Sequence, residues 1–276
     1  MTRRVLVTGG TGFIGRSVVG RLLMGTGSGY NDFDVTIWHQ HSSGSFLKPQ
    51  NQIKVLDAYR PEVVLHLAWH PISSESYEVQ RAHRDWFFAT SRFADECSRR
   101  GVRLICAGSA ADDATASSSH IGKSNYAKYK QHLREKVLGE EHRGWHPTWL
   151  RIQYAFSIVG KRPRIIQSLM QSRDKASFNP EFPNHMHDFI EVNDVSEAIC
   201  LVLHREITGD ITIGSGVLVS TLEFVSAAKF HLGIAPNLPT IVPEKSGASP
   251  VQLLENGWSP RETNLFLGLA ANGVQR

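Results

Sequence analysis

Short apolar runs alternate with longer amphipathic segments through the first two thirds of the chain. The runs have the length and β-branched content of buried strands, and the longer segments have the 3.6-residue spacing of helices. Five runs stand out: Arg4–Thr8, Val35–Trp38, Val63–Leu67, Val102–Cys106 and Thr148–Ile152. Helices are expected between them, over residues 52–59, Glu78–Arg100 and 124–139. Alternation of this kind predicts an α/β fold with a parallel sheet covered by helices on both faces.

This regular pattern stops after Gly160. Loop-like segments rich in Pro, Asn and His follow, and a strand-then-helix pattern returns only at Asp188–Leu203. We therefore expect two parts. Residues 1–160 with about 188–204 would form the sheet domain, and residues 161–187 with 205–276 would form a smaller, interleaved C-terminal lobe.

The composition fits a globular protein, with 41% hydrophobic and 20% charged residues. The net charge of +4 is small and scattered, which suits an anionic small molecule better than nucleic acid. Three cysteines without paired spacing predict neither a disulfide framework nor a metal site. No apolar stretch is long enough for a signal-peptide core or a membrane span. We expect a cytoplasmic protein that acts neither on membranes nor on nucleic acid.

A glycine-rich segment, TGGTGFIG, joins the first strand to the first helix at residues 8–15. Glycines at this place let the backbone approach a pyrophosphate, and the helix N-terminus offers free N–H groups to its oxygens. A plain tight turn is the alternative. The segment predicts a dinucleotide site made by Gly9, Thr11, Gly12, Phe13, Ile14 and Gly15.

The segment SNYAKYKQ raises a second possibility for chemistry. Tyr126 and Lys130 stand four residues apart, which places both side chains on one face of a helix. Ser109 follows the strand that ends at Cys106, at the edge of the sheet where ligands bind in such folds. A polar surface helix and an ordinary loop serine are the alternative interpretations.

Together these segments resemble the extended short-chain dehydrogenase/reductase family of the NAD-dependent epimerase/dehydratase type. The resemblance rests on TGGTGFIG, VVLHLAW at 63–69, CAGSA around Ser109, the Tyr126/Lys130 pair, LRIQYAFSIVG at 150–160, HDFIEVNDVSEAI at 187–199, and later ITIGSG and NGWSP. It covers nearly the whole chain in the family's order. It implies a Rossmann-type doubly wound sheet that binds NAD(P), with the C-terminal lobe binding the substrate.

The resemblance also implies roles for three residues. Tyr126 would exchange a proton with the substrate's carbonyl or hydroxyl, and Lys130 would support it with a positive charge while binding the nicotinamide ribose. Ser109 would hydrogen-bond the reacting oxygen. All three are expected to be catalytic, with Tyr126 and Lys130 also contacting the cofactor.

The departures from the family pattern narrow the reaction. Dehydratases of the family carry an Asp-Glu pair directly after the serine, whereas here Ala110 and Ala111 fill those places. The stretch between Ser109 and Tyr126 is short, as in the nucleotide-sugar 4-ketoreductases that make paratose or abequose. The sequence therefore argues against dehydration.

The cofactor's ribose gives a second clue. NAD-binding members place an acidic residue after the second strand, but this chain reads WHQHSS there. His39, His41 and Ser42 could donate hydrogen bonds to a 2′-phosphate, so NADP (as NADPH) is favoured over NAD. No Arg or Lys stands among them, and ordinary polar loop residues are the alternative. The end of the third strand is expected to complete the cofactor site with Leu67, Ala68 and Trp69.

The substrate site is the least defined part. His70, Ser73, Ser109 and Ala110 are expected to line a sugar pocket. Where the family has Asn and Arg against the nucleotide diphosphate, this chain has Tyr154 and His187. A basic loop could take over diphosphate binding, or could simply be a solvated charge run: Lys161, Arg162 and Arg164.

Three functions remain open at this stage. The first is an NAD(P)H-dependent reductase of a nucleotide-linked 4-keto-deoxy sugar. The second is a sugar-nucleotide epimerase with retained NAD, and the third is a non-catalytic, dinucleotide-sensing protein. A non-nucleotide ketone or aldehyde also remains open as the substrate. The resemblance further implies a homodimer, with Trp86, Phe87 and Phe93 as interface candidates, although core packing explains these residues equally well.

Overall fold

The structure is a computed structural model of the 276-residue chain. It describes residues 2–24, 33–70, 79–112, 124–139, 144–159 and 164–269. The chain divides into two compact units, one made of Met1–Arg151 with Ile199–Ile211, the other of Ile152–Ala198 with Thr212–Arg276. Compactness does not tell which unit binds which ligand, so the expected division into a cofactor domain and a substrate lobe stays a prediction.

The first unit is built on a six-stranded sheet in the order β2-β1-β3-β4-β5-β9. The strands are β1 (Arg3–Thr8), β2 (Phe33–Trp38), β3 (Val63–His66), β4 (Arg103–Ala107), β5 (Thr148–Ile152) and β9 (Gly209–Ile213). β1 pairs in parallel with both β2 and β3, and β4 pairs in parallel with β3 and β5. The chain therefore reverses its direction of winding between β1 and β3, which is the switch point where such sheets bind ligands. The predicted Rossmann-type fold is confirmed.

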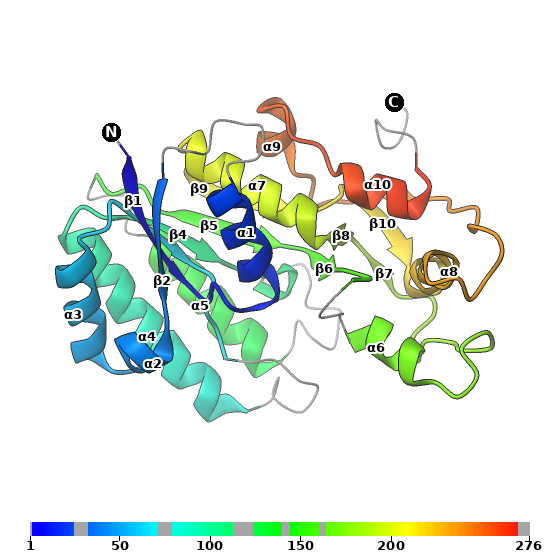
Figure 1. Cartoon of the computed structure of the whole chain (residues 1–276), viewed down its shortest axis with the longest axis horizontal. Helices are drawn as coiled ribbons and strands as arrows, with labels where there is room; N and C mark the ends of the chain where they lie inside the picture. The colour runs from blue at the N-terminus through cyan, green and yellow to red at the C-terminus, as the bar shows by residue number, and fades with distance from the viewer. Residues whose placement is uncertain are drawn as a thin grey trace. The chain divides into compact units, whose positions relative to one another are not determined.

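Helices cover the sheet on both faces. α3 (Pro49–Tyr59), α4 (Gln80–Arg99) and α5 (Asn125–Leu138) lie side by side on one face, and α1 (Phe13–Met24) packs on the other (Figure 1). Because successive strand residues point to opposite faces, Leu6 of β1 enters the α3–α5 core, whereas Val7 lies beside Gly10 and Val19 of α1.

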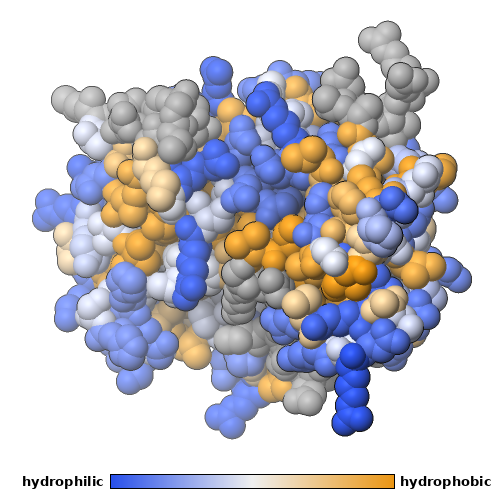
Figure 2. Space-filling model, turned by 45° about the vertical axis from the view of Figure 1, so that its right-hand side comes forward, coloured by the Kyte–Doolittle hydropathy of each residue, from blue (hydrophilic) through white to orange (hydrophobic). Residues whose placement is uncertain are grey.

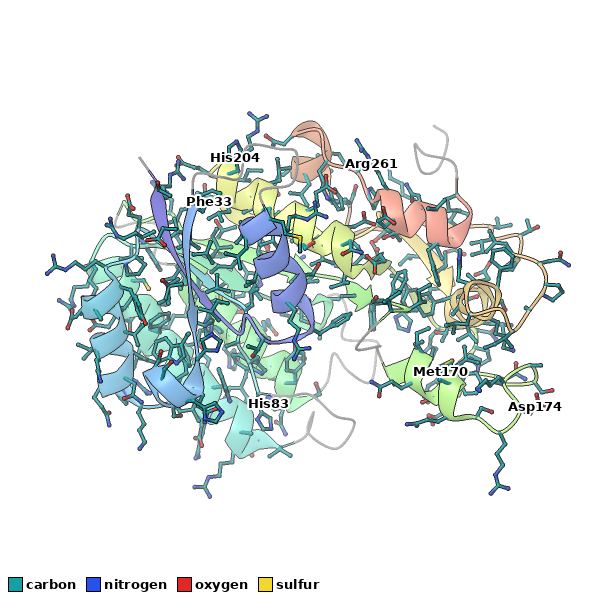
Figure 3. The ribbon with its side chains drawn as sticks, in the orientation of Figure 1. Phe33, His83, Met170, Asp174, His204 and Arg261 are labelled. Atoms are coloured by element: carbon teal, nitrogen blue, oxygen red, sulfur yellow. The ribbon has the colours of Figure 1, made fainter. Side chains whose placement is uncertain are left out.

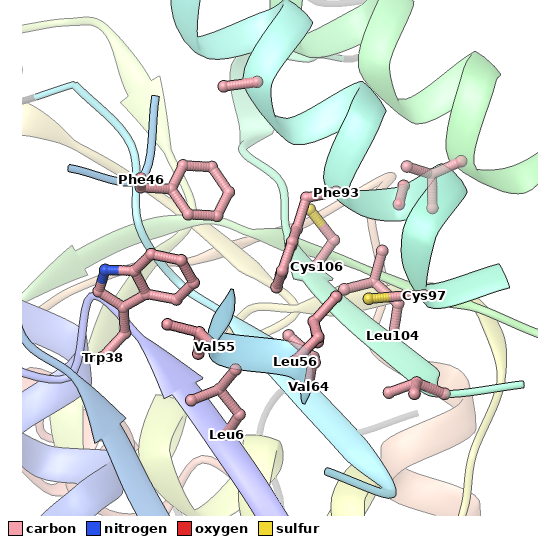
Figure 4. Close-up of a cluster of buried hydrophobic side chains, with 14 of the residues drawn as sticks. Leu6, Trp38, Phe46, Val55, Leu56, Val64, Phe93, Cys97, Leu104 and Cys106 are labelled. Carbon is pink, nitrogen blue, oxygen red and sulfur yellow. The ribbon is translucent and has the colours of Figure 1, made fainter. Parts of the chain in front are cut away.

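The core under α3, α4 and α5 is continuous and aromatic-rich (Figure 4). Phe93 of α4 is fully buried in it, where it packs edge-on against the rings of Trp38 and Phe46. Trp86 stacks on Phe46, with ring centroids 5.5 Å apart, and Phe87 packs partly against the same cluster. Core packing therefore accounts for Phe93, and the expected homodimer stays a prediction.

The second unit contains shorter elements. A two-stranded parallel pair joins β6 (Tyr154–Phe156) to β8 (Phe189–Glu191), and β10 (Val217–Ser220) pairs in antiparallel fashion with β7 (Met186–His187) and β11 (Glu244–Lys245). Its helices are α6 (Arg164–Gln171), α8 (Thr221–His231), α9 (Val251–Glu255) and α10 (Arg261–Leu267), while α7 (Val192–His204) runs from this unit into the first. A cluster of phenylalanines forms its core: Phe156, Phe189, Phe224 and Phe266.

The surface in Figure 2 is mostly hydrophilic, with apolar side chains gathered in separate patches. Within the described ranges, no helix combines the length and the apolar character that crossing a membrane requires. Cys97, Cys106 and Cys200 are buried and are not joined in disulfides.

Candidate active site

The glycine-rich segment forms a tight turn between β1 and α1. Gly9 has a φ of +74°, a conformation that L side chains rarely adopt, and its carbonyl oxygen accepts a hydrogen bond of 2.9 Å from the Gly12 N–H. Arg16 locks the turn by donating from Nε to the Thr11 carbonyl at 2.8 Å. The turn thus places the start of α1 at the switch point between β1 and β3, and leaves Thr11 and Gly12 exposed.

Two glycines in this turn leave no room for a side chain. A Cβ on Gly15 would lie 2.1 Å from the Gly9 carbonyl oxygen, and one on Gly9 would lie 2.6 Å from the Ala68 nitrogen. The turn therefore packs directly on the residues that follow β3. Phe13 and Ile14 open α1, whose first N–H groups have no partner inside the helix. A bare backbone cradle at a helix N-terminus fits the pyrophosphate of a dinucleotide.

His66, at the end of β3, links this strand to β1 and to α4. Its ring hydrogen-bonds to Thr8 Oγ1 at 2.7 Å and to Thr90 Oγ1 at 3.2 Å. Burial, with a smaller contribution from the positive charge of Lys130, lowers the pKa of His66 to about 3, so the ring is neutral. Leu67 and Ala68 then run past the glycine turn, held by the Leu67 N–H to the Thr8 carbonyl.

The helix α5 presents Tyr126 and Lys130 on its buried face. Ser124 caps the helix by accepting a hydrogen bond from the Ala127 N–H at 3.2 Å. Tyr126 and Lys130 are buried, whereas Lys128 is exposed and Tyr129 packs against Phe87. The helical spacing therefore separates the candidate pair from its two neighbours of the same residue types.

Lys130 is a buried ammonium beside a backbone carbonyl and two indole rings, those of Trp69 and Trp149. Its Nζ donates a 2.7 Å hydrogen bond to the carbonyl oxygen of Ala107, at the end of β4, and lies 4.0 Å from the centre of the Trp69 ring. Burial lowers the pKa of Lys130 to about 8, opposed by the nearby Cys106 and Asp112. A charge held in such a place is typical of functional sites.

Trp69 and His83 form a wall beside the Tyr126/Lys130 pair. Trp69 donates from Nε1 to His83 Nδ1 at 3.3 Å, and His83 is fully buried in the first turn of α4 (Figure 3). The Tyr126 ring lies edge-on to both, with centroids 6.4 Å from Trp69 and 5.6 Å from His83. Sequence reasoning singled out Trp69 but missed His83, because a lone histidine in a helical pattern carries no signal of its own.

Ser109 sits in a short loop after β4 that folds into a 3₁₀ turn (η3, Ala110–Asp112). Its Oγ accepts a hydrogen bond from the Ala111 N–H at 3.2 Å, and its own N–H donates to Asp112 Oδ2 at 2.8 Å. Asp112 is almost completely buried and also accepts from Trp149 Nε1 at 3.0 Å. η3 packs against α5, so the Ser109 loop and the Tyr126 helix lie together.

Gly108 explains why this loop has its shape. A Cβ there would lie 2.2 Å from Trp149 Nε1 and 2.7 Å from Asp112 Oδ2. Only a glycine lets these two side chains meet across the backbone just before Ser109.

The residues after β2 are exposed. His39 precedes the short helix α2 (Gln40–Ser43), and its carbonyl accepts from Ser42 Oγ at 3.5 Å. His39, His41 and Ser42 all face solvent, and no carboxylate occurs from His39 to Ser43. His70, after Trp69, is half-buried and its ring meets His83 edge-on at 5.9 Å.

The remaining expected substrate contacts belong to the second unit or lie outside the described residues. Tyr154 and His187 meet within the second unit, with ring centroids 4.1 Å apart, and burial lowers the pKa of His187 to about 4. A neutral aromatic pair thus stands where the family pattern has Asn and Arg. Ser73, Lys161 and Arg162 lie outside the described residues, and Arg164 is the first residue of α6. Among the residues described, no three His, Cys, Asp or Glu could share a metal ion.

The family model for the NAD dependent epimerase/dehydratase family matches residues 5–214. That span contains the glycine turn, the Ser109 loop and α5. A comparison with curated protein sequences finds no match.

Solved structures with the same fold include both epimerases and reductases. A Thermus thermophilus UDP-glucose 4-epimerase in complex with NAD superposes with a TM-score of 0.71 at 21% identity, covering 94% of each chain. A Bacillus anthracis dTDP-4-dehydrorhamnose reductase with NADP gives 0.68 at 13%, covering 94% of this chain and 93% of the other. A Campylobacter jejuni GDP-D-glycero-L-gluco-heptose synthase, in the presence of NADPH, gives 0.73 at 13%, covering 94% of each. At these identities the likeness shows a shared fold.

Proposed function

The chain belongs to the NAD dependent epimerase/dehydratase family and is thus an NAD(P)-dependent enzyme of the extended short-chain dehydrogenase/reductase class; on that premise we propose that it reduces a nucleotide-linked 4-keto-deoxy sugar with NADPH. The observation that carries the proposal is the buried Lys130 ammonium, held by Ala107 and Trp69 on the same helix face as Tyr126. A buried charge of this kind has a cost that a purely structural helix face would avoid.

The cofactor would be held by the glycine turn and the residues after β3. Gly12 would receive the pyrophosphate, with Thr11, Phe13 and Ile14 at the helix start, while Gly9 and Gly15 would shape the turn by their close packing. Lys130 would bind the nicotinamide ribose. NADPH, when bound, supplies the hydride for the carbonyl carbon. The chain's part is to fix the reacting carbonyl and to provide the proton.

Tyr126 would give its phenolic proton to the carbonyl oxygen, and the ammonium of Lys130 would favour the phenolate that remains. Ser109 would donate a hydrogen bond from Oγ to the same oxygen. Trp69 and His83 would keep water from this side of the site, since their rings pack together and against Tyr126. Leu67, Ala68, His70 and Ala110 would complete the walls.

Reduction is favoured over dehydration by the place of Asp112. A dehydratase of this class needs acidic groups free to act beside the serine, but Asp112 is buried and accepts hydrogen bonds from Ser109 N–H and Trp149 Nε1.

The residues that follow β2 favour a reductase, which exchanges its cofactor in each turnover, over an epimerase, which retains it. Exposed His39, His41 and Ser42 offer hydrogen-bond donors, and no carboxylate there would repel a 2′-phosphate.

The test offers nucleotide-linked 4-keto-6-deoxy sugars to the purified protein while NADPH and NADH absorbance are followed. The matched controls are the corresponding 4-hydroxy sugars. Stoichiometric loss of NADPH with formation of a deoxy-sugar alcohol is the expected result. Interconversion of the 4-hydroxy sugars without net cofactor loss, or NAD retained by the protein as isolated, would make it an epimerase instead.

A further inference from the structure

A row of alternating charges runs through the first unit from the Ser109 loop to α5. Asp112 Oδ1 lies 3.4 Å from Arg151 Nε, and Arg151 donates from a terminal nitrogen to Asp210 Oδ2 at 2.7 Å. The same Asp210 oxygen accepts from Arg134 Nε at 3.0 Å and from the Arg134 terminal nitrogen. Arg134 is on α5, one turn after Lys130.

The inner part of this row is strongly shielded from water. The Asp112 side chain has no exposed surface and that of Arg151 is 14% exposed, while Asp210 and Arg134 are about a quarter exposed. Burial raises the pKa of Asp112, opposed by the Ser109 N–H and by the charges of Arg151 and Lys130. Removal of one member would leave its neighbour in the row with less compensation for a shielded charge, so the members depend on one another.

Both ends of the row reach candidate catalytic groups. At one end the Asp112 carboxylate accepts hydrogen bonds from the backbone N–H of Ser109 and from Trp149 Nε1. The contact with Trp149 is possible because Gly108 has no side chain. At the other end Arg134 holds α5, whose preceding turn carries Lys130 and whose first turn carries Tyr126. Arg151 and Asp210 stand between them on β5 and β9.

We propose that Asp112, Arg151, Asp210 and Arg134 are positioning residues, an ion row that holds the Ser109 loop and the Tyr126 helix in one fixed arrangement. Ser109 and Tyr126 come from separate elements and must reach the same substrate oxygen, so their relative position sets the rate. The hydrogen bond from Lys130 to Ala107 joins the same two elements at the nearer end. The catalytic part of this inference rests on the proposed function.

The test is a double-mutant cycle between the two ends of the row. Asp112→Asn keeps an acceptor for the Ser109 N–H but removes the charge that faces Arg151, and Arg134→Met keeps the apolar stem but removes the guanidinium. We expect each to lower kcat by about 10- to 100-fold with little change in KM, because a displacement of about 1 Å in an active site can cost about 100-fold. The double variant should be little slower than the slower single variant, since both break one row.

Lys136 supplies the matched control. It lies on the same helix, where its Nζ binds Asp95 at 2.7 Å near the surface, away from the row. The single variant Lys136→Met should have the kcat of the wild type. Combined with Asp112→Asn, it should lower kcat no further than Asp112→Asn does by itself. Additive effects of Asp112→Asn and Arg134→Met on kcat, or losses confined to KM, would overturn the proposal.

A second measurement separates this inference from the proposed function. The same variants are unfolded in urea without substrate, and the midpoint shifts should again be smaller in the double variant than the sum of the singles. If no sugar is turned over but this coupling is present, the proposed function fails while the row stands as the link between the two elements. Additive midpoint shifts overturn the row whatever the turnover. If Asp112→Asn does not fold, Asp210→Asn takes its place, and an unchanged kcat in that variant overturns the proposal.

Discussion

The ammonium of Lys130 lies 4.0 Å from the centre of the Trp69 indole ring, in a place with almost no contact with water. The ring face offers the charge a weak attraction, and the Ala107 carbonyl offers one hydrogen bond. Burial brings the pKa of Lys130 down from 10.5 to about 8, and the nearby Cys106 and Asp112 oppose this shift. The protonated lysine therefore lowers the stability of the folded protein.

The first prediction follows from that pKa. In the unfolded chain Lys130 keeps its proton up to pH 10.5, whereas in the folded protein it loses it near pH 8. Between these values the unfolded state binds more protons, so the free energy of unfolding should rise with pH. Below pH 8 the charged lysine lowers stability by about 3 kcal/mol. Lys130→Met should therefore raise the free energy of unfolding at pH 7 by about 2 kcal/mol, after loss of its hydrogen bond, while abolishing turnover.

Urea titrations at pH 7, 8, 9 and 10 measure this effect, with Lys128→Met, exposed on the same helix, as the control. The wild-type kcat/KM for the sugar should also fall as pH rises through about 8, because the neutral amine no longer supports Tyr126. A Lys130→Met protein that is less stable than the wild type at pH 7 would contradict the account.

The second prediction concerns the proton donor. Tyr126→Phe removes only the phenolic oxygen and should lower kcat by about 10²- to 10⁴-fold, the usual contribution of a general acid. The dissociation constant for NADPH, measured by fluorescence titration, should change little. Tyr129→Phe on the neighbouring face of α5, where the ring packs against Phe87, is the matched control and should keep full activity. Equal kcat values for the two variants would remove Tyr126 from the mechanism.

The third prediction concerns the cofactor. His39 is exposed directly after β2, and His39→Asp would place a carboxylate where a 2′-phosphate is expected. Like charges about 4 Å apart repel by roughly 1–4 kcal/mol at a partly exposed site. The ratio of kcat/KM for NADPH over NADH should fall by about 10-fold or more, since 1.4 kcal/mol is a factor of about 10.

Gln50→Asp, the same charge change at an exposed position on α3, should leave that ratio unchanged. If His39→Asp also leaves the ratio of kcat/KM for NADPH over NADH unchanged, the residues after β2 do not contact the 2′-position of the cofactor's ribose.

Five of the six strands in the first unit's sheet, and its longer helices, could be predicted because their patterns are local; β9 and the short helix α2 were not predicted. The five apolar runs correspond to β1–β5, with ends displaced by no more than two residues, as at Phe33 and Leu67. Ser124 predicts the start of α5, because serine is a preferred residue at the N-cap of a helix. Tyr126 and Lys130 could be paired for the same reason, since helix geometry alone places them on one face.

Contacts between distant segments could not be predicted in this way. Trp69 meets His83 across 14 residues, and Arg151 meets Asp210 across 59. An arginine inside the apolar run TWLRI signals that a buried partner must exist, but the sequence does not say which carboxylate it is. The contact between Asp112 and Trp149 could not be predicted either, because it depends on the missing side chain of Gly108.

The fourth prediction compares two glycines of α1. Gly15→Ala would place its Cβ 2.1 Å from the Gly9 carbonyl oxygen and 2.8 Å from Gly10 Cα, both of them backbone atoms that cannot rotate away. The turn would have to open, so we expect a loss of several kcal/mol in the free energy of unfolding, with overpacking alone costing about 1–3 kcal/mol. NADPH binding should be lost with it.

Gly20, in the same helix, has nothing within 4 Å of a Cβ, so Gly20→Ala should raise stability by about 0.5–1 kcal/mol and leave binding intact. Urea unfolding and NADPH titration of both variants make the comparison, and a Gly15→Ala protein that binds NADPH normally would show that the cofactor does not lie on this turn.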